Sequence, residues 1–279
     1  MRWWCSATGS AWSWAWRPYV GAWVLVAFAA GFMWRGGSFR RDVAWTRRVA
    51  AALGLVLFAA SIDWPLAALG AGYLATAQAL RQVLVVIIAA PLLLAGAPPA
   101  FGDWIAASSR RRAVLRVVSH PGLALLLAVS VLVVVNLPPV ADATLTSQFG
   151  SFAIDAAWIV SGIIMWLPVQ VPPTTGAPLA PRLRGPVAVV YLIVASIGPL
   201  PVAFFMTWSD FPIYEVYELA PRVVSGLGPK EDQELAAAVL QVLGGTMIWV
   251  QIAVRFAAMA GMKRDSGFRG RQVTSGGVS

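Results

Sequence analysis

Runs of apolar residues, broken by short polar segments, make up most of this chain. A helix needs about 20 predominantly apolar residues to cross the hydrocarbon core of a membrane. Stretches of this kind occupy residues 19–34, 49–69, 73–94, 122–140, 149–169, 186–208 and 235–262, and tryptophans ahead of the first stretch extend it into the interface. The pattern predicts an all-α fold, a polytopic integral membrane protein built as a bundle of seven transmembrane helices. Prolines inside the spans, at Pro91, Pro138, Pro139, Pro199 and Pro201, predict kinks.

Composition supports this prediction and removes several classes of site. Hydrophobic residues make up 59% of the 279 residues and charged residues only 12%, well below the charged share of a typical soluble domain. The single cysteine, Cys5, excludes an internal disulfide, and the single histidine, His120, excludes a histidine cluster for a metal. The sequence contains no P-loop, nucleophile elbow or dinucleotide-binding turn, so we expect neither an enzyme nor a bound cofactor.

The distribution of basic residues predicts the orientation of the bundle. Alternate loops and the C-terminal end carry most of the positive charge, at Arg35, Arg40, Arg41, Arg47, Arg48, Arg110, Arg111, Arg112, Arg116, Arg182, Arg184, Arg255, Lys263, Arg264, Arg269 and Arg271. The opposite side holds only Arg2, Arg17, Arg222 and Lys230, together with most of the acidic residues. The positive-inside rule therefore places the N-terminus outside and the C-terminus in the cytoplasm. The net charge of +9 then indicates anionic lipid at the cytoplasmic face as a partner, rather than nucleic acid.

Three segments follow from these assignments. Residues 1–18 are rich in tryptophan, and we expect this N-terminal segment to lie in the membrane interface. Residues 19–262 form the seven-helix membrane domain, and residues 263–279 form a basic cytoplasmic tail that we expect to be disordered. No cleavable signal peptide is expected, because the N-terminal segment lacks an apolar core ahead of a small-residue cleavage site.

Two connecting loops are long enough to form structure of their own. In residues 100–120, apolar side chains from Val114 to Val118 beside the arginines predict a helix on the lipid surface. An ordinary basic loop that only fixes the topology is the preferred interpretation over a specific docking role.

The other loop, residues 210–234, is acidic, carries tyrosines and is the longest external segment. Pro229 followed by acidic residues predicts the start of a helix there. We predict that this loop docks partner subunits through Asp210, Tyr214, Tyr217, Glu231, Asp232 and Gln233. A simple connection between two helices is the alternative.

The third predicted span is unusual because it contains Gln78, Arg81 and Gln82. An arginine at membrane depth is costly and normally faces a partner. At about 1.5 Å per helical residue, Asn136 of the fourth span and Asp155 of the fifth lie in the same outer half of the membrane. We therefore predict that Arg81 pairs with Asp155 and that the three amides complete the hydrogen bonds. These five residues are called the buried polar cluster below.

Two interpretations of the buried polar cluster stay open. It is either a site for a substrate or ion, or a buried salt bridge that fixes helix packing. Amide and carboxylate oxygens suit hard ions better than copper or zinc, so we expect no transition-metal site here. Methionines are able to bind Cu(I), but Met33, Met165, Met206, Met247, Met259 and Met262 are scattered through the spans, which favours core filling.

Several segments resemble the seven-helix CtaG family of cytochrome c oxidase assembly factors. The most specific are TWSDFPIYEVY and GLGPKEDQELAAAVLQVLGG in the external loop and last span, and VLVVIIAAPLLLAGAPP at the end of the third span is similar. SHPGLALLL, NLPPVADATL and IIMWLPV also fit, so the resemblance covers residues 14–262, nearly the whole chain. It implies a multi-pass protein of the bacterial cytoplasmic membrane whose partners are haem-copper oxidase subunits.

The chain departs from the family at the positions that the resemblance associates with copper. Members of the family carry a His-x-x-x-His pair where this chain has Gln78 and Gln82, and a histidine where it has Asn136. A spaced acidic or histidine pair falls at Ser151 and Asp155, and the family's Met-Trp falls at Leu240 and Gln241. None of the side chains that this chain carries at these positions binds Cu(I) well.

We therefore expect a non-catalytic accessory or assembly subunit of a haem-copper oxidase, whose copper-handling site has become a polar, ion-paired cluster. One alternative is a copper-delivery factor that uses methionines or a partner's ligands. Another is a small transporter or ion path that uses the Arg81–Asp155 pair, although an odd number of spans without an internal repeat disfavours it.

Overall fold

The computed structural model describes residues 2–177, 179 and 181–257, and within them the chain is helical without any strand. Its helices, with π-helical segments marked η, are α1 (Val20–Arg35), α2 (Trp45–Ile62), α3 (Leu66–Gly72), α4 (Ala75–Val83), η1 (Leu84–Ala89), α5 (Ala90–Ala95), α6 (Pro99–Ala106), α7 (Ser109–Val118), α8 (Pro121–Val135), α9 (Pro138–Leu145), α10 (Gln148–Trp166), α11 (Gly185–Ile197), α12 (Leu200–Trp208), α13 (Glu215–Glu218), α14 (Pro229–Ala238) and η2 (Val239–Leu243). The predicted tail, with Met259 and Met262, lies outside the described residues.

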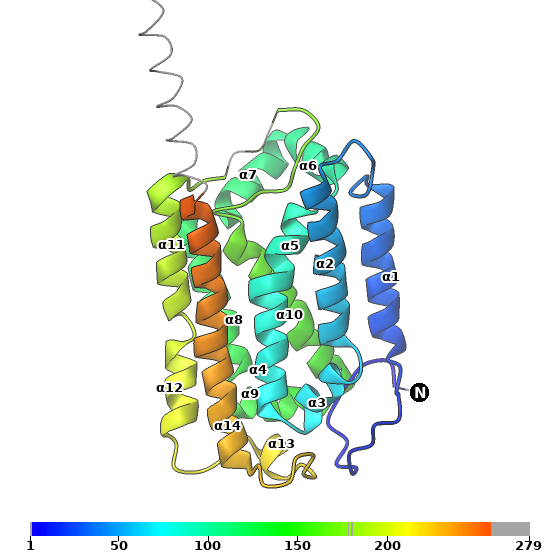
Figure 1. Cartoon of the computed structure of the whole chain (residues 1–279), viewed down its shortest axis with the longest axis vertical. Coiled ribbons are helices and arrows are strands. Elements are labelled where there is room, and N and C mark those ends of the chain that lie inside the picture. The colour runs from blue at the N-terminus through cyan, green and yellow to red at the C-terminus, as the bar shows by residue number, and fades with distance from the viewer. Residues whose placement is uncertain (1, 178, 180, 258–279) are drawn as a thin grey trace, which may run out of the picture.

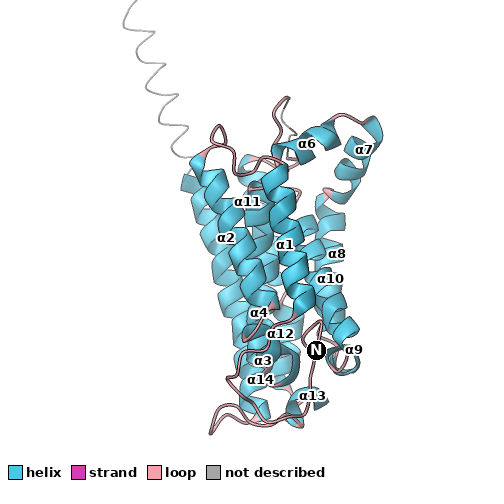
Figure 2. Ribbon diagram, turned by 90° about the vertical axis from the view of Figure 1, so that its right-hand side faces the viewer, coloured by secondary structure: helices cyan, strands magenta, loops and turns pink. Residues whose placement is uncertain are grey.

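The long helices run side by side along one axis (Figures 1 and 2). Five of them are long and apolar enough to cross a membrane: Trp45–Ile62, Ala75–Ala95, Gln148–Trp166, Gly185–Trp208 and Pro229–Ala257. A sixth is formed if Ser109–Val118 and Pro121–Val135, which meet at a bend of 63°, count as one span. Val20–Arg35 is apolar but only 16 residues long. An all-helical protein with five to six candidate spans is therefore established, and the count of seven remains a prediction.

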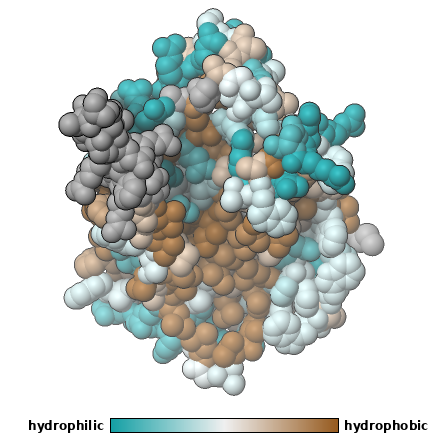
Figure 3. Space-filling view, turned by 45° about the horizontal axis from the view of Figure 1, so that its top comes forward, coloured by the Kyte–Doolittle hydropathy of each residue, from teal (hydrophilic) through white to brown (hydrophobic). Residues whose placement is uncertain are grey.

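The two ends of the bundle differ in charge. At the end drawn uppermost in Figure 1 lie the loop after α1, the helices α6 and α7, and the connection between α10 and α11, which carry most of the arginines. We call this the basic end, and Figure 3 shows hydrophilic residues gathered around it above a hydrophobic flank. The acidic end holds the N-terminal segment, α3, α9 and α13. Residues 100–120, where a helix on the lipid surface was predicted, form the two helices α6 and α7, and their position at the lipid surface stays a prediction.

Several helices end or begin at prolines, and two helix ends differ from the predicted ones. The second predicted span continued to residue 69, but α2 ends at Ile62 and the short α3 begins after Pro65. The fourth was predicted to run to residue 140, but α8 ends at Val135 and α9 starts with Pro138 in its first turn, where the missing N–H of proline costs nothing. Pro199 falls at the break between α11 and α12, which agrees with the predicted kink. Pro229 begins α14, as predicted.

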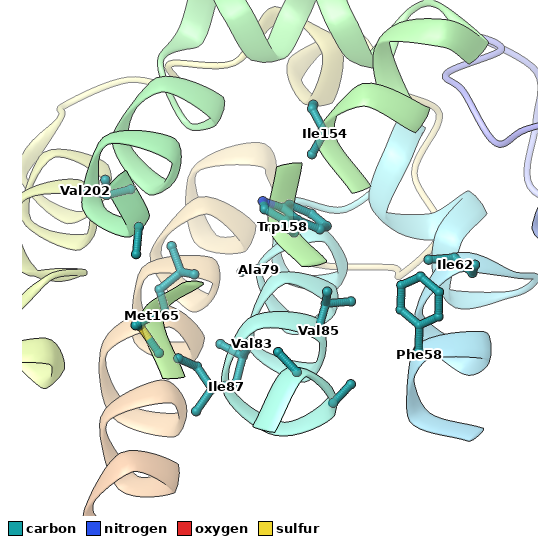
Figure 4. Packing of buried hydrophobic residues seen from close by; sticks show 14 of the residues in the cluster. Phe58, Ile62, Ala79, Val83, Val85, Ile87, Ile154, Trp158, Met165 and Val202 are labelled. Atoms are coloured by element: carbon teal, nitrogen blue, oxygen red, sulfur yellow. The ribbon is translucent and has the colours of Figure 1, made fainter. Parts of the chain in front are cut away.

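Helices α4 and α10 form the centre of the packing. Figure 4 shows Trp158 of α10 beside Ala79 of α4, with Phe58 and Ile62 of α2 on one side and Met165 on the other. Trp158 is fully buried among these side chains. The faces of α4 and α10 that carry the buried polar cluster therefore point toward each other at the centre of the bundle.

Candidate functional site

Arg81 is the central residue of the site, and its side chain is completely buried. One guanidinium nitrogen, Nη2, donates to both carboxylate oxygens of Asp155 at 2.7 Å. Nη1 donates to the Oε1 atom of Gln78 at 2.7 Å, and Nε donates to the backbone carbonyl of Ser61 at 2.6 Å. The pair predicted from the depths of Arg81 and Asp155 is formed, and every nitrogen of the guanidinium has an acceptor.

Asp155 has a further partner that closes the site on its other side. The indole Nε1 of Trp4 donates to its Oδ2 atom at 2.9 Å, and Trp4 is itself buried. The neighbouring Cys5 contacts the Ser151 hydroxyl at 3.4 Å between sulfur and oxygen. Burial raises the pKa of the Cys5 thiol to about 11, so it stays protonated at neutral pH. No activated nucleophile results from this pair of groups.

The N-terminal segment is therefore divided between two environments. Trp14 and Trp16 are exposed, but Trp4 and Cys5 pack inside the bundle. The backbone N–H groups of Trp3 and Trp4 donate to the Oε1 atom of Gln148, which holds the segment against α10. Trp4 packs inward because its indole N–H donates to the buried carboxylate of Asp155, which otherwise accepts hydrogen bonds from Arg81 alone.

Close approach of α3 completes the wall around Arg81. A Cβ atom at Gly70 would lie 2.8 Å from the Arg81 Cδ atom and 2.8 Å from the Gln78 Oε1 atom, so only glycine fits there. The carbonyl of Gly70 also accepts a hydrogen bond from the Tyr217 hydroxyl at 2.7 Å. On the opposite side, the ring of Trp158 lies 5.5 Å from the guanidinium carbon, a cation–π distance.

The remaining amides of the buried polar cluster form a second contact. Asn136 Nδ2 donates to the Gln82 Oε1 atom at 3.1 Å and to the carbonyl of Leu132 at 2.8 Å. Gln78 joins the ion pair instead, although it shares a helix face with Gln82. The structure thus brings all five predicted residues into one region, as an ion pair with one amide and a separate amide pair.

A small cavity of about 20 Å³ lies between these two groups and the acidic end. Gln78, Asn136, Trp158 and Met206 line it, and so do Tyr214 and Tyr217. Met206 is the only methionine in its lining, whereas Met165 lines a different, apolar cavity of about 50 Å³. The methionines therefore do not converge on the cluster in the described part of the chain.

The donor set does not fit copper. No group of three His, Cys, Asp or Glu side chains converges anywhere in residues 2–177, 179 and 181–257. The one carboxylate of the site, Asp155, already accepts three hydrogen bonds, and Cu(I) prefers thiolate, thioether or imidazole ligands. A fully bonded ion pair offers a bound ion no free charge.

The structure corrects the predicted docking residues of the external loop. Tyr214, Tyr217, Asp232 and Gln233 are buried, and only Asp210 and Glu231 of the six are exposed. The hydroxyl of Tyr214 donates to the carbonyl of Asn136 at 2.9 Å, so this tyrosine packs inward, not at the membrane surface. Burial raises the pKa of both tyrosines, which keeps their hydroxyls protonated as donors.

Asp232 and Gln233 stabilise the chain's own backbone. Asp232 accepts hydrogen bonds from the N–H groups of Ala75 at 2.6 Å and Thr76 at 3.1 Å, which are the first residues of α4. Gln233 bridges the N–H of Ile213 and the carbonyl of Met206. Asp232 thus caps the helix that carries Arg81, a role that the sequence motif alone did not reveal.

Sequence reasoning missed the contributions of Trp4, Trp158 and the Ser61 carbonyl. Trp4 lies far from Asp155 in the sequence, and a backbone carbonyl leaves no trace in a sequence pattern. The unusual tryptophan content of the first residues was the only available signal, and it pointed equally well to the interface.

The chain matches the family described as cytochrome c oxidase caa3 assembly factor over residues 22–261. This range contains every described helix except the first two residues of α1, and it contains every member of the buried polar cluster. No curated protein and no solved structure matches the chain.

Proposed function

The chain belongs to the cytochrome c oxidase caa3 assembly factor family, and we propose that it is a non-catalytic accessory or assembly subunit of a haem-copper oxidase. In this proposal the chain associates with oxidase subunits in the cytoplasmic membrane of a bacterium but does not itself deliver copper. The bundle crosses the membrane seven times, counting the short α1 and the bent α7–α8 pair, with the basic end in the cytoplasm.

One observation carries the proposal: Gln78, Gln82, Asn136 and Asp155, at positions that the resemblance associates with copper, form hydrogen bonds with Arg81 or with each other. Arg81 and Asp155 neutralise each other within 2.7 Å, and Gln82 and Asn136 bond to each other. A buried charge pair of this kind is stable only when its geometry is good and all its donors and acceptors are used. The cluster therefore favours a role in fixing α4 against α10 over a role in binding a metal.

The two alternatives have less support. Copper delivery through methionines needs at least two sulfur ligands in one place, and Met206 is the only sulfur side chain lining the cavity beside the cluster. An ion path through Arg81 and Asp155 needs water on both sides of the pair. Trp4, Trp158 and Gly70 pack directly around it.

We further propose that the exposed part of the external loop docks the oxidase. Asp210 and Glu231 point outward, and the apolar Phe211 and Leu219 are exposed in the same segment. An acidic surface with exposed apolar side chains is suited to a partner with basic residues around an apolar patch.

The test is purification of the full-length chain from membranes in a mild detergent. We expect oxidase subunits and the oxidase haem spectrum to accompany it. The double variant Asp210→Lys, Glu231→Lys should reduce the recovered oxidase, whereas Asp42→Lys at the basic end should not. Isolation of a free monomer from membranes rich in oxidase would contradict the proposal.

A further inference from the structure

A broad groove lies at the basic end between α1 and α6. Its volume is about 760 Å³, and aromatic side chains form much of its walls. Phe28 and Phe32 of α1 face Phe101 and Trp104 of α6, and all four rings are exposed. The ring centroids of Phe32 and Phe101 lie 5.9 Å apart, and so do those of Phe101 and Trp104. The aromatic surface is therefore continuous from α1 to α6.

The groove is held open by close backbone contacts and does not depend on mobile side chains. A Cβ atom at Gly36 would collide with the ring of Pro98, so the end of α1 and the start of α6 fit together only through glycine. A Cβ atom at Gly102 would collide with the carbonyl oxygen of Pro173 in the same way. Asp103 adds hydrogen bonds from the Thr175 N–H at 2.8 Å and the Thr175 hydroxyl at 2.6 Å. Helix α6 is therefore fixed on both sides.

The charges around the groove are positive. Arg35 lines it directly, at the end of α1. The guanidinium carbon of Arg111, on α7, lies 4.2 Å from the centre of the Trp104 ring. Trp104, Arg110 and Arg111 together line a second groove beside the first. Of the acidic residues that the structure describes at this end, Asp42 is paired with Arg40 and Asp103 is bonded to Thr175. Asp103 keeps its negative charge, but neither it nor any other carboxylate forms a salt bridge with Arg35, Arg110 or Arg111 in the described part of the chain.

From this combination we infer that the groove between α1 and α6 binds an anionic phospholipid. Its acyl chain lies along the aromatic surface, and its phosphate lies against Arg35. The seven helical steps from Phe28 to Arg35 rise about 10 Å along the helix, a length suited to the upper part of an acyl chain below its headgroup. The aromatic surface of the groove ends at the positive charge of Arg35, which matches a lipid whose acyl chain ends at an anionic headgroup. An uncharged transmembrane helix of a partner protein in the same groove would leave Arg35 without an anionic partner.

This inference goes beyond the proposed function, because it requires neither an oxidase nor a metal. It also gives the basic loop a task more specific than setting the topology. The arginines of α7 alone would attract anionic lipid in general, whereas the groove selects one lipid molecule by shape and charge together.

The experiment is native mass spectrometry of the delipidated full-length chain after titration with phosphatidylglycerol or phosphatidylcholine. We expect one phosphatidylglycerol to bind more tightly than phosphatidylcholine. Because a single arginine near an anionic surface contributes about 1 kcal/mol, Arg35→Gln should weaken phosphatidylglycerol about fivefold, and it should weaken phosphatidylcholine less because the choline cation offsets the phosphate. Trp104→Ala should weaken both lipids.

The matched control is Arg41→Gln, which removes an exposed arginine at the same end that lines neither this groove nor the second one. It should leave the affinity for phosphatidylglycerol unchanged. Equal losses in the Arg35 and Arg41 variants would overturn the inference in favour of general surface attraction. Equal affinities of the native chain for the two lipids would also overturn it. A dimer of the chain that forms without bound lipid and is lost in Trp104→Ala would overturn it too, because a second copy of the chain would then occupy the groove.

Discussion

The guanidinium of Arg81 is the group on which the interior of this protein depends. Its nitrogens donate to Ser61, Gln78 and Asp155, and the carboxylate it faces also accepts from Trp4. In a low-dielectric interior such a network is stable when complete and costly when one member is removed. Removal of one partner alone is therefore costly, whereas replacement of both by apolar residues of similar size costs far less.

Removal of the carboxylate alone tests this requirement. Asp155→Ala should lower the free energy of unfolding by about 3–5 kcal/mol, because it leaves Arg81 as an uncompensated buried charge. Reversible unfolding in mixed micelles, followed by tryptophan fluorescence, measures the effect. The exposed Asp210→Ala serves as the control and should change stability little.

The double variant Arg81→Leu, Asp155→Leu distinguishes packing from function. It should recover most of the lost stability, because both charges are gone together. If it also still copurifies with oxidase subunits, the pair serves packing alone. A double variant as unstable as Asp155→Ala would mean that the hydrogen bonds of Gln78, Ser61 and Trp4 matter more than the charges.

Some contacts of Arg81 and Asp155 could be predicted from the sequence, and others could not. Depth along two spans was enough to pair Arg81 with Asp155, because charges inside spans are rare and need each other. The same estimate placed Asn136 and the glutamines nearby but did not show which amide joins which partner. Trp4 was not predictable as the second donor to Asp155, since the contact depends on how the N-terminal segment folds back onto α10.

Among the helices, the start of α4 is stabilised from a distant part of the chain. Its N-cap residue, Leu74, has no side chain able to accept a hydrogen bond, and Asp232 of α14 accepts from Ala75 and Thr76 instead. Negative charge at a helix N-terminus is favourable, so the same carboxylate satisfies the free N–H groups and the helix dipole. In this way α14 fixes the position of the helix that carries Arg81.

Asp232→Ala should therefore lower the free energy of unfolding by about 1–2 kcal/mol, the usual cost of a lost cap. Glu231→Ala, which changes an exposed neighbour in the same turn, is the matched control and should have little effect. Hydrogen exchange should rise locally at the start of α4 in the Asp232 variant. Unchanged exchange at Ala75 and Thr76 would contradict the capping role.

The N-terminal segment is a second element that acts at a distance. Besides the Trp4 contact, the N–H of Ala7 donates to the carbonyl of Leu145, and the N–H of Gly21 donates to the carbonyl of Trp3. These bonds hold the segment over α9, α10 and the start of α1. Cys5 within it provides a chemical probe of whether the segment is closed.

Because burial raises the pKa of the Cys5 thiol from 9.0 to about 11, its thiolate fraction near pH 7 falls about 100-fold. The native chain should react with N-ethylmaleimide at least about 100-fold more slowly than the denatured chain. Trp4→Ala should speed the reaction, whereas Trp16→Ala, at an exposed position of the same segment, should not. Rapid labelling of the native chain would show that the segment does not pack as described.

Helix positions were predicted better than helix ends. Apolar length identified the long helices, and Pro229 identified the start of α14. The ends of α2 and α8 were misplaced because apolar residues continue past both of them, while Pro65 and Pro138 start new short helices. The burial of Tyr214 and Tyr217 was also missed, since an amphipathic side chain in a loop gives the same signal in either place.

At the scale of the whole molecule, the chain is a helical bundle with opposite charge at its two ends and a closed polar centre. The charge distribution and membership of the caa3 assembly factor family both suit a membrane protein that works beside an oxidase. The polar centre is what separates this chain from the copper-handling pattern that the resemblance implies. We therefore predict that the protein keeps the fold without binding the metal at the buried polar cluster.

Titration of the purified full-length chain with Cu(I), in competition with a chromogenic chelator, tests this claim most directly. The double variant Gln82→His, Asn136→His is the positive control, because those two side chains are in contact and two imidazoles suit Cu(I). We predict no stoichiometric Cu(I) on the native chain and a gain of binding in the double variant. One Cu(I) per native chain, lost in Met206→Leu or Asp155→Asn, would contradict the account.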